Sequence, residues 1–171
     1  MNLIFNKSIK IKELNEKQEI VFYVDSFFDH MTKNIGYGLL LVINNRVIIK
    51  DLGLACMHSV NFSKNILGEI MGVIKATNIA FVNSYKEITI FHNSLGIEKW
   101  ITNEWSIKDQ VVMKYKKIIK NRIKYMKINF KIININANAY RKEKYGDGHL
   151  KLIYEVRSLA KFASKTSRIQ L

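Results

Sequence analysis

Three consecutive β-type segments in residues 20–52 constrain the fold of this chain more than any other feature. The first segment, residues 20–28, consists mainly of β-branched and aromatic residues, which is typical of a buried strand. Two further strands are predicted at 36–43 and 46–52. The Asn44-Asn45 pair between them favours a two-residue hairpin turn, because asparagine tolerates positive φ angles. The fold is therefore predicted to begin with three antiparallel strands.

Helices and strands alternate over the rest of the chain. We expect helices at 61–83, 94–102, 109–127 and 150–163, strands at 86–92 and 128–135, and an irregular polar loop at 136–148. This order predicts an α/β fold in which helices cover the faces of a mixed, five-stranded sheet.

Length and composition indicate a single domain. The chain has 171 residues, of which 48% are hydrophobic, enough for one full core. We expect the domain at 20–164, with a polar N-terminal extension at 1–19 and a C-terminal tail at 165–171. No apolar run is long enough to span a bilayer, and a single cysteine excludes a disulfide framework. No secretory signal is visible, so we expect a cytoplasmic protein, or an organelle-matrix one if it is organelle-encoded.

The positive charge is concentrated in the C-terminal third. Residues 106–171 carry a net charge of +13, whereas residues 1–105 carry +1. This asymmetry favours a polyanionic partner, with nucleic acid first and an anionic membrane surface second. An alternative is that an AT-rich genome supplies the 23 lysines through its codons, although such a bias would act on both parts of the chain alike.

Two acidic residues are candidates for a metal site. Asp25 lies inside a hydrophobic strand, where a carboxylate is costly unless it is paired or bound to metal. Glu69 lies in the first predicted helix, between Gly68 and Gly72, which let that helix pack close to the sheet. Two-metal nuclease sites are built from several such carboxylates. The alternative is structural, because an Asp in a strand and a Glu on a helix are both common.

The sequence resembles a known family of nucleases. The patterns YVD at 23–25, GYG at 36–38, LGEI at 67–70 and YKEITIFHNSLGIEKWITNEW at 85–105 are similar to type 1 ribonuclease H. The resemblance covers about residues 20–164. It implies a ribonuclease H-like sheet of strand order 3-2-1-4-5. It also implies hydrolysis of the RNA strand of RNA–DNA hybrids by two Mg²⁺ ions held on an Asp-Glu-Asp-Asp set, whose first two acids match Asp25 and Glu69.

The other two acids of that set are missing. Asn93 stands at the third position and Arg157 at the fourth, so the charge of the site falls from −4 to −1. A neutral amide is a poor Mg²⁺ ligand, and a guanidinium repels the ion. We therefore expect that hydrolysis is lost or severely weakened, and that no cofactor is bound; Mg²⁺ or Mn²⁺ would be required if activity remained. The family's Asp-Gly-Ser is here Asp25-Ser26-Phe27, which adds bulk.

Four other residues are candidates to replace the missing ligands. They are Asp29, Asp147, His149 and Glu155. Glu155 is expected to face away, because it lies about 200° from Arg157 around a helix, and His149 is expected in the loop.

A basic helix and a tryptophan are candidates for binding nucleic acid. The basic residues are Lys114, Lys116, Lys117, Lys120, Arg122, Lys124 and Lys127. In the family that this chain resembles, a basic helix and nearby aromatic residues grip the DNA strand. We expect Trp105 to be exposed and Trp100 to lie in the core. The alternative for the lysines is an ordinary solvated helix face.

Three hypotheses follow. The first is a pseudoenzyme with a ribonuclease H-like fold that binds RNA, hybrid or duplex as a scaffold subunit of a nucleoprotein assembly, with protein partners. The second is an active Mg²⁺- or Mn²⁺-dependent ribonuclease H. The third is a protein-interaction module whose lysines reflect codon bias.

Overall fold

Five strands and four helices make up the part of the chain that the structure, a computed structural model, describes: residues 18–55, 64–133 and 140–166. In chain order they are β1 (Ile20–Phe28), β2 (Ile35–Ile43), β3 (Arg46–Ala55), α1 (Lys64–Val82), β4 (Glu87–His92), α2 (Gly96–Thr102), α3 (Gln110–Ile123), β5 (Lys127–Ile132) and α4 (Tyr140–Lys165). The strands form one sheet in the order β3-β2-β1-β4-β5, which confirms the predicted mixed sheet.

The sheet combines a local antiparallel half with a parallel half. Strands β1, β2 and β3 are antiparallel neighbours, while β4 runs parallel to β1 and β5 runs parallel to β4. Asn44 and Asn45 join β2 to β3 with φ angles of 48° and 62°, as the predicted hairpin turn requires. A register shift after Leu41 leaves Ile48 of β3 as an extra residue, which is a β-bulge.

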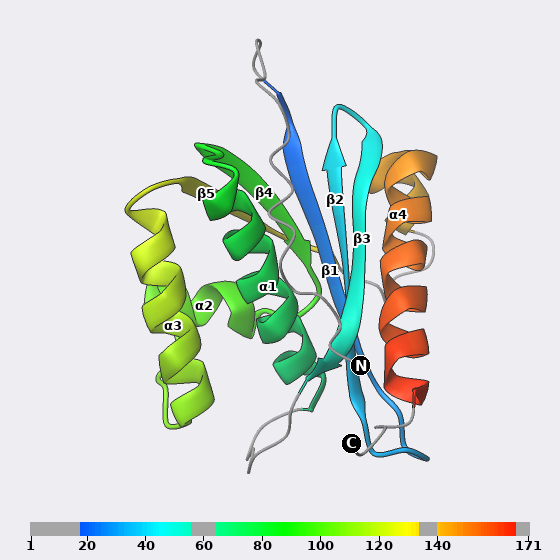
Figure 1. The fold of residues 1–171 in the computed structure, drawn as a ribbon, viewed down its shortest axis with the longest axis horizontal. Helices are drawn as coiled ribbons and strands as arrows, with labels where there is room; N and C mark the ends of the chain where they lie inside the picture. Colours follow the sequence, from blue (N-terminus) through cyan, green and yellow to red (C-terminus); the bar gives the residue numbers. More distant parts are fainter. Residues whose placement is uncertain (1–17, 56–63, 134–139, 167–171) are drawn as a thin grey trace.

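Helices cover both faces of the sheet unequally (Figure 1). Helices α1, α2 and α3 lie on one face, where the larger core includes Phe22, Leu41 and Trp100. Of the helices that the structure describes, α4 is the one on the other face, where it packs on a smaller core that includes Tyr23, Leu40 and Val156.

Glycines set how closely the two long helices approach the sheet. A Cβ at Gly72 of α1 would lie 2.3 Å from the Val24 side chain, and one at Gly68 would lie 2.5 Å from that of Ser26. On the other face, a Cβ at Gly38 of β2 would lie 2.3 Å from the carbonyl oxygen of Val156 in α4. Real side chains do not come this close, so glycine is required at these positions. Both helices therefore lie near the strand that carries Asp25.

Two predicted boundaries differ most from the structure. Helix α4 begins at Tyr140 and runs through Gly146 and Gly148, where a loop was expected up to residue 148. A glycine inside a helix costs only about 1 kcal/mol, and extending a helix that is already packed on β1 and β2 is favourable. Helix α3 ends at Ile123 rather than at 127, and the Ile123 side chain is exposed, because the chain turns there into β5.

Several expectations fall outside the described residues. They concern Ser63 as the N-cap of α1, residues 136–139 of the expected loop, and most of both terminal segments. Among the described residues, no helix combines the length and the apolar character needed to cross a bilayer.

Candidate functional site

Two buried carboxylates lie near each other at one end of the sheet. Asp25 lies near the end of β1 and is 2% exposed, and Glu69 lies in the first half of α1 and is 1% exposed. The close approach of α1 at Gly68 brings Glu69 beside the ends of β1 and β4. Burial, together with the smaller effect of the nearby Asp25 charge, raises the pKa of Glu69 to about 7. The structure thus brings together the two acids that the sequence singled out.

Glu69 is held by the residues that follow β4. The backbone N–H of Ser94 donates to Oε2 at 2.9 Å, and that of Asn93 donates to the same oxygen at 3.3 Å. The hydroxyl of Ser94 donates to Oε1 at 2.9 Å. Both carboxylate oxygens are therefore engaged by the protein itself. Ser94 was not among the predicted site residues, because its only signal in the sequence is a hydroxyl residue next to Asn93.

Asp25 is paired with Arg157 of α4. Nη1 of Arg157 lies 3.8 Å from Oδ2 of Asp25, and the backbone N–H of Ser26 donates to Oδ1 at 2.8 Å. Burial raises the pKa of Asp25 to about 6, although the Ser26 N–H and the Arg157 charge partly oppose this. Arg157 therefore stands beside the carboxylate at the position where the resemblance implies a fourth acid.

An open cleft of about 550 Å³ lies at this site. Its polar lining includes Glu69, Ser94, Arg157 and the exposed Asn93. Its aromatic lining consists of Phe27 and Phe28 at the end of β1, His30 just beyond, and Trp105 between α2 and α3. The bulk of Phe27 is evident from the sequence, whereas the cleft that these aromatic side chains share is seen only in the structure.

The ligands present do not fit a pair of divalent cations. Among the described residues, no group of three or more His, Cys, Asp or Glu side chains is placed to hold a metal ion. The two acids of the site are engaged by Ser94, Ser26 and Arg157, and Asn93 offers only a neutral amide. A guanidinium at 3.8 Å from Asp25 would repel a divalent cation bound there.

The candidate replacement ligands lie elsewhere, as far as the described residues show. Asp29 accepts hydrogen bonds from the N–H groups of Met31 and Thr32 in the β1–β2 turn. Glu155 forms an ion pair with Lys50 of β3, so it faces away as predicted.

His149 is helical rather than in a loop, which corrects its expected position. It forms a hydrogen bond with the Tyr23 hydroxyl and packs against Phe91. The side chain of Asp147 lies outside the described residues.

The tryptophans lie as predicted. Trp100 is buried, and Trp105 is 42% exposed with its ring 6.1 Å from that of Trp100. Trp105 also lines a second groove of about 500 Å³ together with Lys116 and Lys117 of α3. The site cleft and the basic helix therefore share one exposed aromatic side chain.

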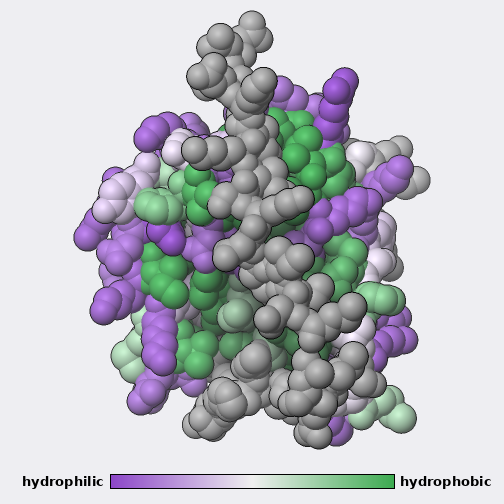
Figure 2. Space-filling model, viewed as in Figure 1, coloured by the Kyte–Doolittle hydropathy of each residue, from purple (hydrophilic) through white to green (hydrophobic). Residues whose placement is uncertain are grey.

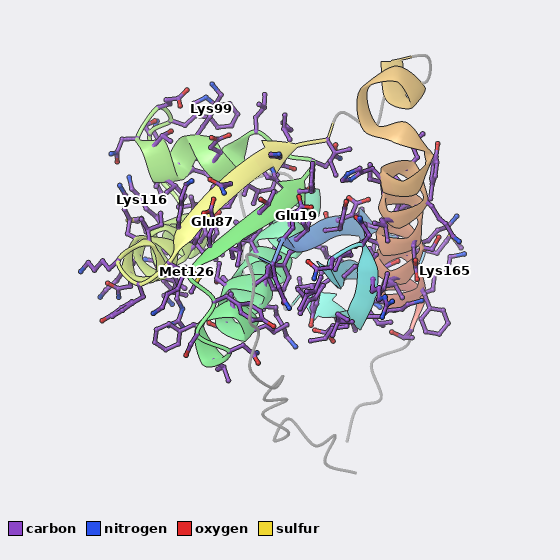
Figure 3. The ribbon with its side chains drawn as sticks, turned by 90° about the horizontal axis from the view of Figure 1, so that it is seen from above. Glu19, Glu87, Lys99, Lys116, Met126 and Lys165 are labelled. Carbon is purple, nitrogen blue, oxygen red and sulfur yellow. The ribbon has the colours of Figure 1, made fainter. Side chains whose placement is uncertain are left out.

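The basic residues of the predicted binding helix divide into two groups. Lys116 and Lys120 lie four residues apart on one line of α3, and Lys124 follows at the end of the helix. Lys114, Lys117, Lys120 and Lys124 are exposed, whereas Lys116 is half-buried and donates to Oδ1 of Asn103. Figure 2 shows hydrophilic side chains along the α3 edge of the molecule. Figure 3 places Lys116 on this edge and Lys165 on the opposite side, at the end of α4.

Arg122 and Lys127 belong to the second group. Arg122 donates to Oδ1 of Asn78 at 2.7 Å and lies 4.1 Å from the Phe81 ring centroid, so it ties α3 to α1. Lys127 lies in β5, not in the helix, and its ammonium is 2.9 Å from Glu87. These two residues have structural partners, which the sequence did not indicate.

Comparison with solved structures identifies the fold. RNase H1 from the halophilic archaeon Halobacterium salinarum NRC-1 has a TM-score of 0.62 at 14% identity, covering 85% of this chain and 96% of that one. The prototype foamy virus protease–reverse transcriptase has a TM-score of 0.65 at 15% identity, covering 96% of this chain and 23% of that one. LC11-RNase H1, solved with an RNA/DNA hybrid, has a TM-score of 0.55 at 15% identity, and the match covers 73% of this chain and 92% of that one.

The chain therefore has the ribonuclease H-like fold, as its sheet order and its structural neighbours both show. Neither a protein-family model nor a curated protein sequence matches it.

Proposed function

We propose that this protein binds nucleic acid through its basic helix and the adjoining cleft, and does not hydrolyse it. The observation that carries the proposal is the position of Trp105. Its exposed ring lines both the site cleft and the groove with Lys116 and Lys117. Lysines bind phosphates without reading sequence, and an exposed aromatic ring offers a stacking surface. A solved structural neighbour, LC11-RNase H1, was crystallised with an RNA/DNA hybrid, which supports nucleic acid as the ligand class.

The loss of hydrolysis is inferred from the chemistry of the site. Arg157 supplies a positive charge beside Asp25, and the oxygens of Glu69 accept three hydrogen bonds from Asn93 and Ser94. These contacts engage Oδ1 of Asp25 and both oxygens of Glu69 without a metal ion, while Oδ2 of Asp25 lies 3.8 Å from the Arg157 guanidinium and has no hydrogen-bond partner among the described residues. The protein thereby keeps the shape of the fold and an anion-binding arginine, and would serve as a binding or scaffold subunit of a nucleoprotein assembly.

One experiment tests binding and cleavage together. End-labelled RNA–DNA hybrid, duplex RNA and duplex DNA are incubated with the protein, first with Mg²⁺ and then with Mn²⁺. We expect salt-sensitive binding without cleavage. Cleavage by the native chain that is lost in Asp25→Ala would show an active ribonuclease H. If the protein neither binds nor cleaves, the proposal is wrong and a protein-interaction module becomes the better hypothesis.

A further inference from the structure

The cleft at the site combines a phosphate-binding cation with aromatic walls. Arg157 lines it, and its side chain is 41% exposed even though it pairs with Asp25. Nη1 of Arg157 lies 3.8 Å from Oδ2 of Asp25, which is longer than a hydrogen bond. The ion pair therefore does not use the N–H donors of the guanidinium for a hydrogen bond to Asp25. An arginine of this kind suits the oxygens of a phosphate.

A second cation and an aromatic ring lie next to Arg157. Lys161 follows it by one helical turn on α4, and its ammonium lies 5.8 Å from the ring centroid of Phe27. Phe27 and Asp25 are two residues apart in β1, so they point to the same face of the sheet, towards α4. The positive charge and the ring are therefore arranged side by side at the end of β1.

The remaining aromatic side chains complete the walls of the cleft. The Phe28 ring packs edge-on against His30, with centroids 4.9 Å apart, and both residues line the cleft. Trp105 lines it from the α2–α3 connection. A cleft of about 550 Å³ is within the size range of small-ligand sites. An aromatic base and a phosphate together match this lining.

We propose that the cleft takes one unpaired nucleotide, with its phosphate at Arg157 and Lys161 and its base against Phe27 and Trp105. A base inside a duplex is stacked on its neighbours and cannot enter such a cleft. The protein would therefore select single strands, or duplexes with an unpaired extension, over blunt duplexes. This inference rests on the proposed function and names the nucleic-acid feature that the site recognises.

Binding of three labelled probes to the full chain tests the inference: a single-stranded RNA, a blunt RNA–DNA hybrid, and the same hybrid with a short unpaired RNA extension. Fluorescence anisotropy gives the affinities. We expect the extended hybrid to bind about tenfold more tightly than the blunt one. We expect Phe27→Leu to weaken binding of the extended hybrid much more than binding of the blunt hybrid, and so to remove most of this difference.

Two further variants keep the test falsifiable. Arg157→Gln is expected to lower affinity for the extended probe about fivefold, so the test remains if Phe27→Leu unfolds the protein. Phe162→Leu, an exposed phenylalanine on α4 that does not line the cleft, is the matched control and is expected to behave as the native chain.

The outcomes separate this inference from the proposed function. Equal affinity for blunt and extended hybrids, or an equal loss on both in Phe27→Leu, would overturn the inference alone. Absence of binding to all three probes would overturn the proposed function as well. Titration with adenosine monophosphate tests whether the cleft binds a free nucleotide instead of one in a strand. The assignment to a strand would be overturned if the native chain bound adenosine monophosphate, Phe27→Leu weakened this binding, and the native chain showed no preference for the extended hybrid.

Discussion

Glu69 and Asp25 make the candidate site sensitive to pH through their burial. Glu69 has an ordinary pKa of 4.5 that burial and the charge of Asp25 raise to about 7, and Asp25 shifts from 3.8 to about 6. A carboxyl group whose pKa is raised by folding holds its proton more tightly in the folded state than in the unfolded state. This contribution to stability is fully present below the ordinary pKa and is lost as the pH rises through the raised pKa of the folded state. His92 acts in the opposite direction, because burial lowers its pKa to about 4.

Replacing Glu69 with glutamine isolates its contribution. We expect the native chain to lose up to about 3 kcal/mol of unfolding free energy relative to Glu69→Gln between pH 4.5 and pH 7. Urea unfolding of both proteins across this range measures the difference, in which the opposing effect of His92 cancels. A difference that stays constant with pH would show that Glu69 ionises normally.

Asn93 and Arg157 are the residues that we expect to prevent metal binding. The double variant Asn93→Asp, Arg157→Asp restores two carboxylates beside Asp25 and Glu69. We expect it to bind Mn²⁺ at least about tenfold more tightly than the native chain, because hard cations prefer anionic oxygen ligands. Isothermal titration calorimetry measures the affinity. Arg157→Gln alone removes the repelling charge without adding a ligand, so it serves as the control; unchanged Mn²⁺ affinity in the double variant would contradict the prediction.

At the scale of elements, glycine contacts hold α4 against β2. A Cβ at Gly38 would lie 2.3 Å from a backbone oxygen of α4, so Gly38→Ala must push the helix away from the sheet. We expect a loss of about 3 kcal/mol in stability and a fall in Tm of about 10 °C. Differential scanning calorimetry measures both.

Gly148 of α4 is the matched control, because nothing lies within 4 Å of a Cβ placed there. Gly148→Ala removes a helix-weakening residue and should stabilise the protein by roughly 0.5–1 kcal/mol. If both alanine variants had the same effect, the close approach of α4 would not be the cause.

Local patterns predicted the elements better than they predicted their contacts. The Asn44-Asn45 turn and the strand containing Asp25 depend on neighbouring residues, and the structure confirms them. The start of α4 was missed because packing on the sheet outweighs the cost of Gly146 and Gly148.

The same limit applies to the candidate site. The juxtaposition of Asp25 and Glu69 followed from their place in the chain. The contact between Ser94 and Glu69, and the stacking of Arg122 on Phe81, join residues that are distant in sequence. No periodicity marks such pairs, so only the folded structure shows them.

At the scale of the whole molecule, the positive charge of the C-terminal third lies on both faces of the sheet. The net charge of +13 in residues 106–171 includes the exposed lysines of α3 on one face and Lys151 and Lys161 of α4 on the other. A surface that neutralises several phosphates releases counterions, so its affinity falls steeply with salt.

Reversing two charges on α3 tests this surface. In Lys117→Glu, Lys120→Glu we expect weaker duplex binding and a salt dependence that is shallower by about one unit of log–log slope per lost phosphate contact. Anisotropy titrations over a range of salt concentrations measure the slope. Lys151→Glu, an exposed lysine on α4, is the control, since α4 covers the opposite face of the sheet. An equal effect in the control would indicate a general charge effect instead of a binding surface.

The bulge at Ile48 and the basic residues near it also affect how the protein behaves at high concentration. Within the part of the chain that the structure describes, strands β3 and β5 form the two edges of the sheet, and edge strands carry backbone groups that can pair with another molecule. The bulge interrupts the regular hydrogen-bond spacing of β3, which also carries Arg46 and Lys50, and β5 carries Lys127 and Lys131. Lys50 and Lys127 are paired with Glu155 and Glu87, but Arg46 and Lys131 still place a positive charge at each edge, and charged side chains disfavour the pairing of two edges. We therefore expect concentrated solutions of the folded protein to resist edge-to-edge aggregation.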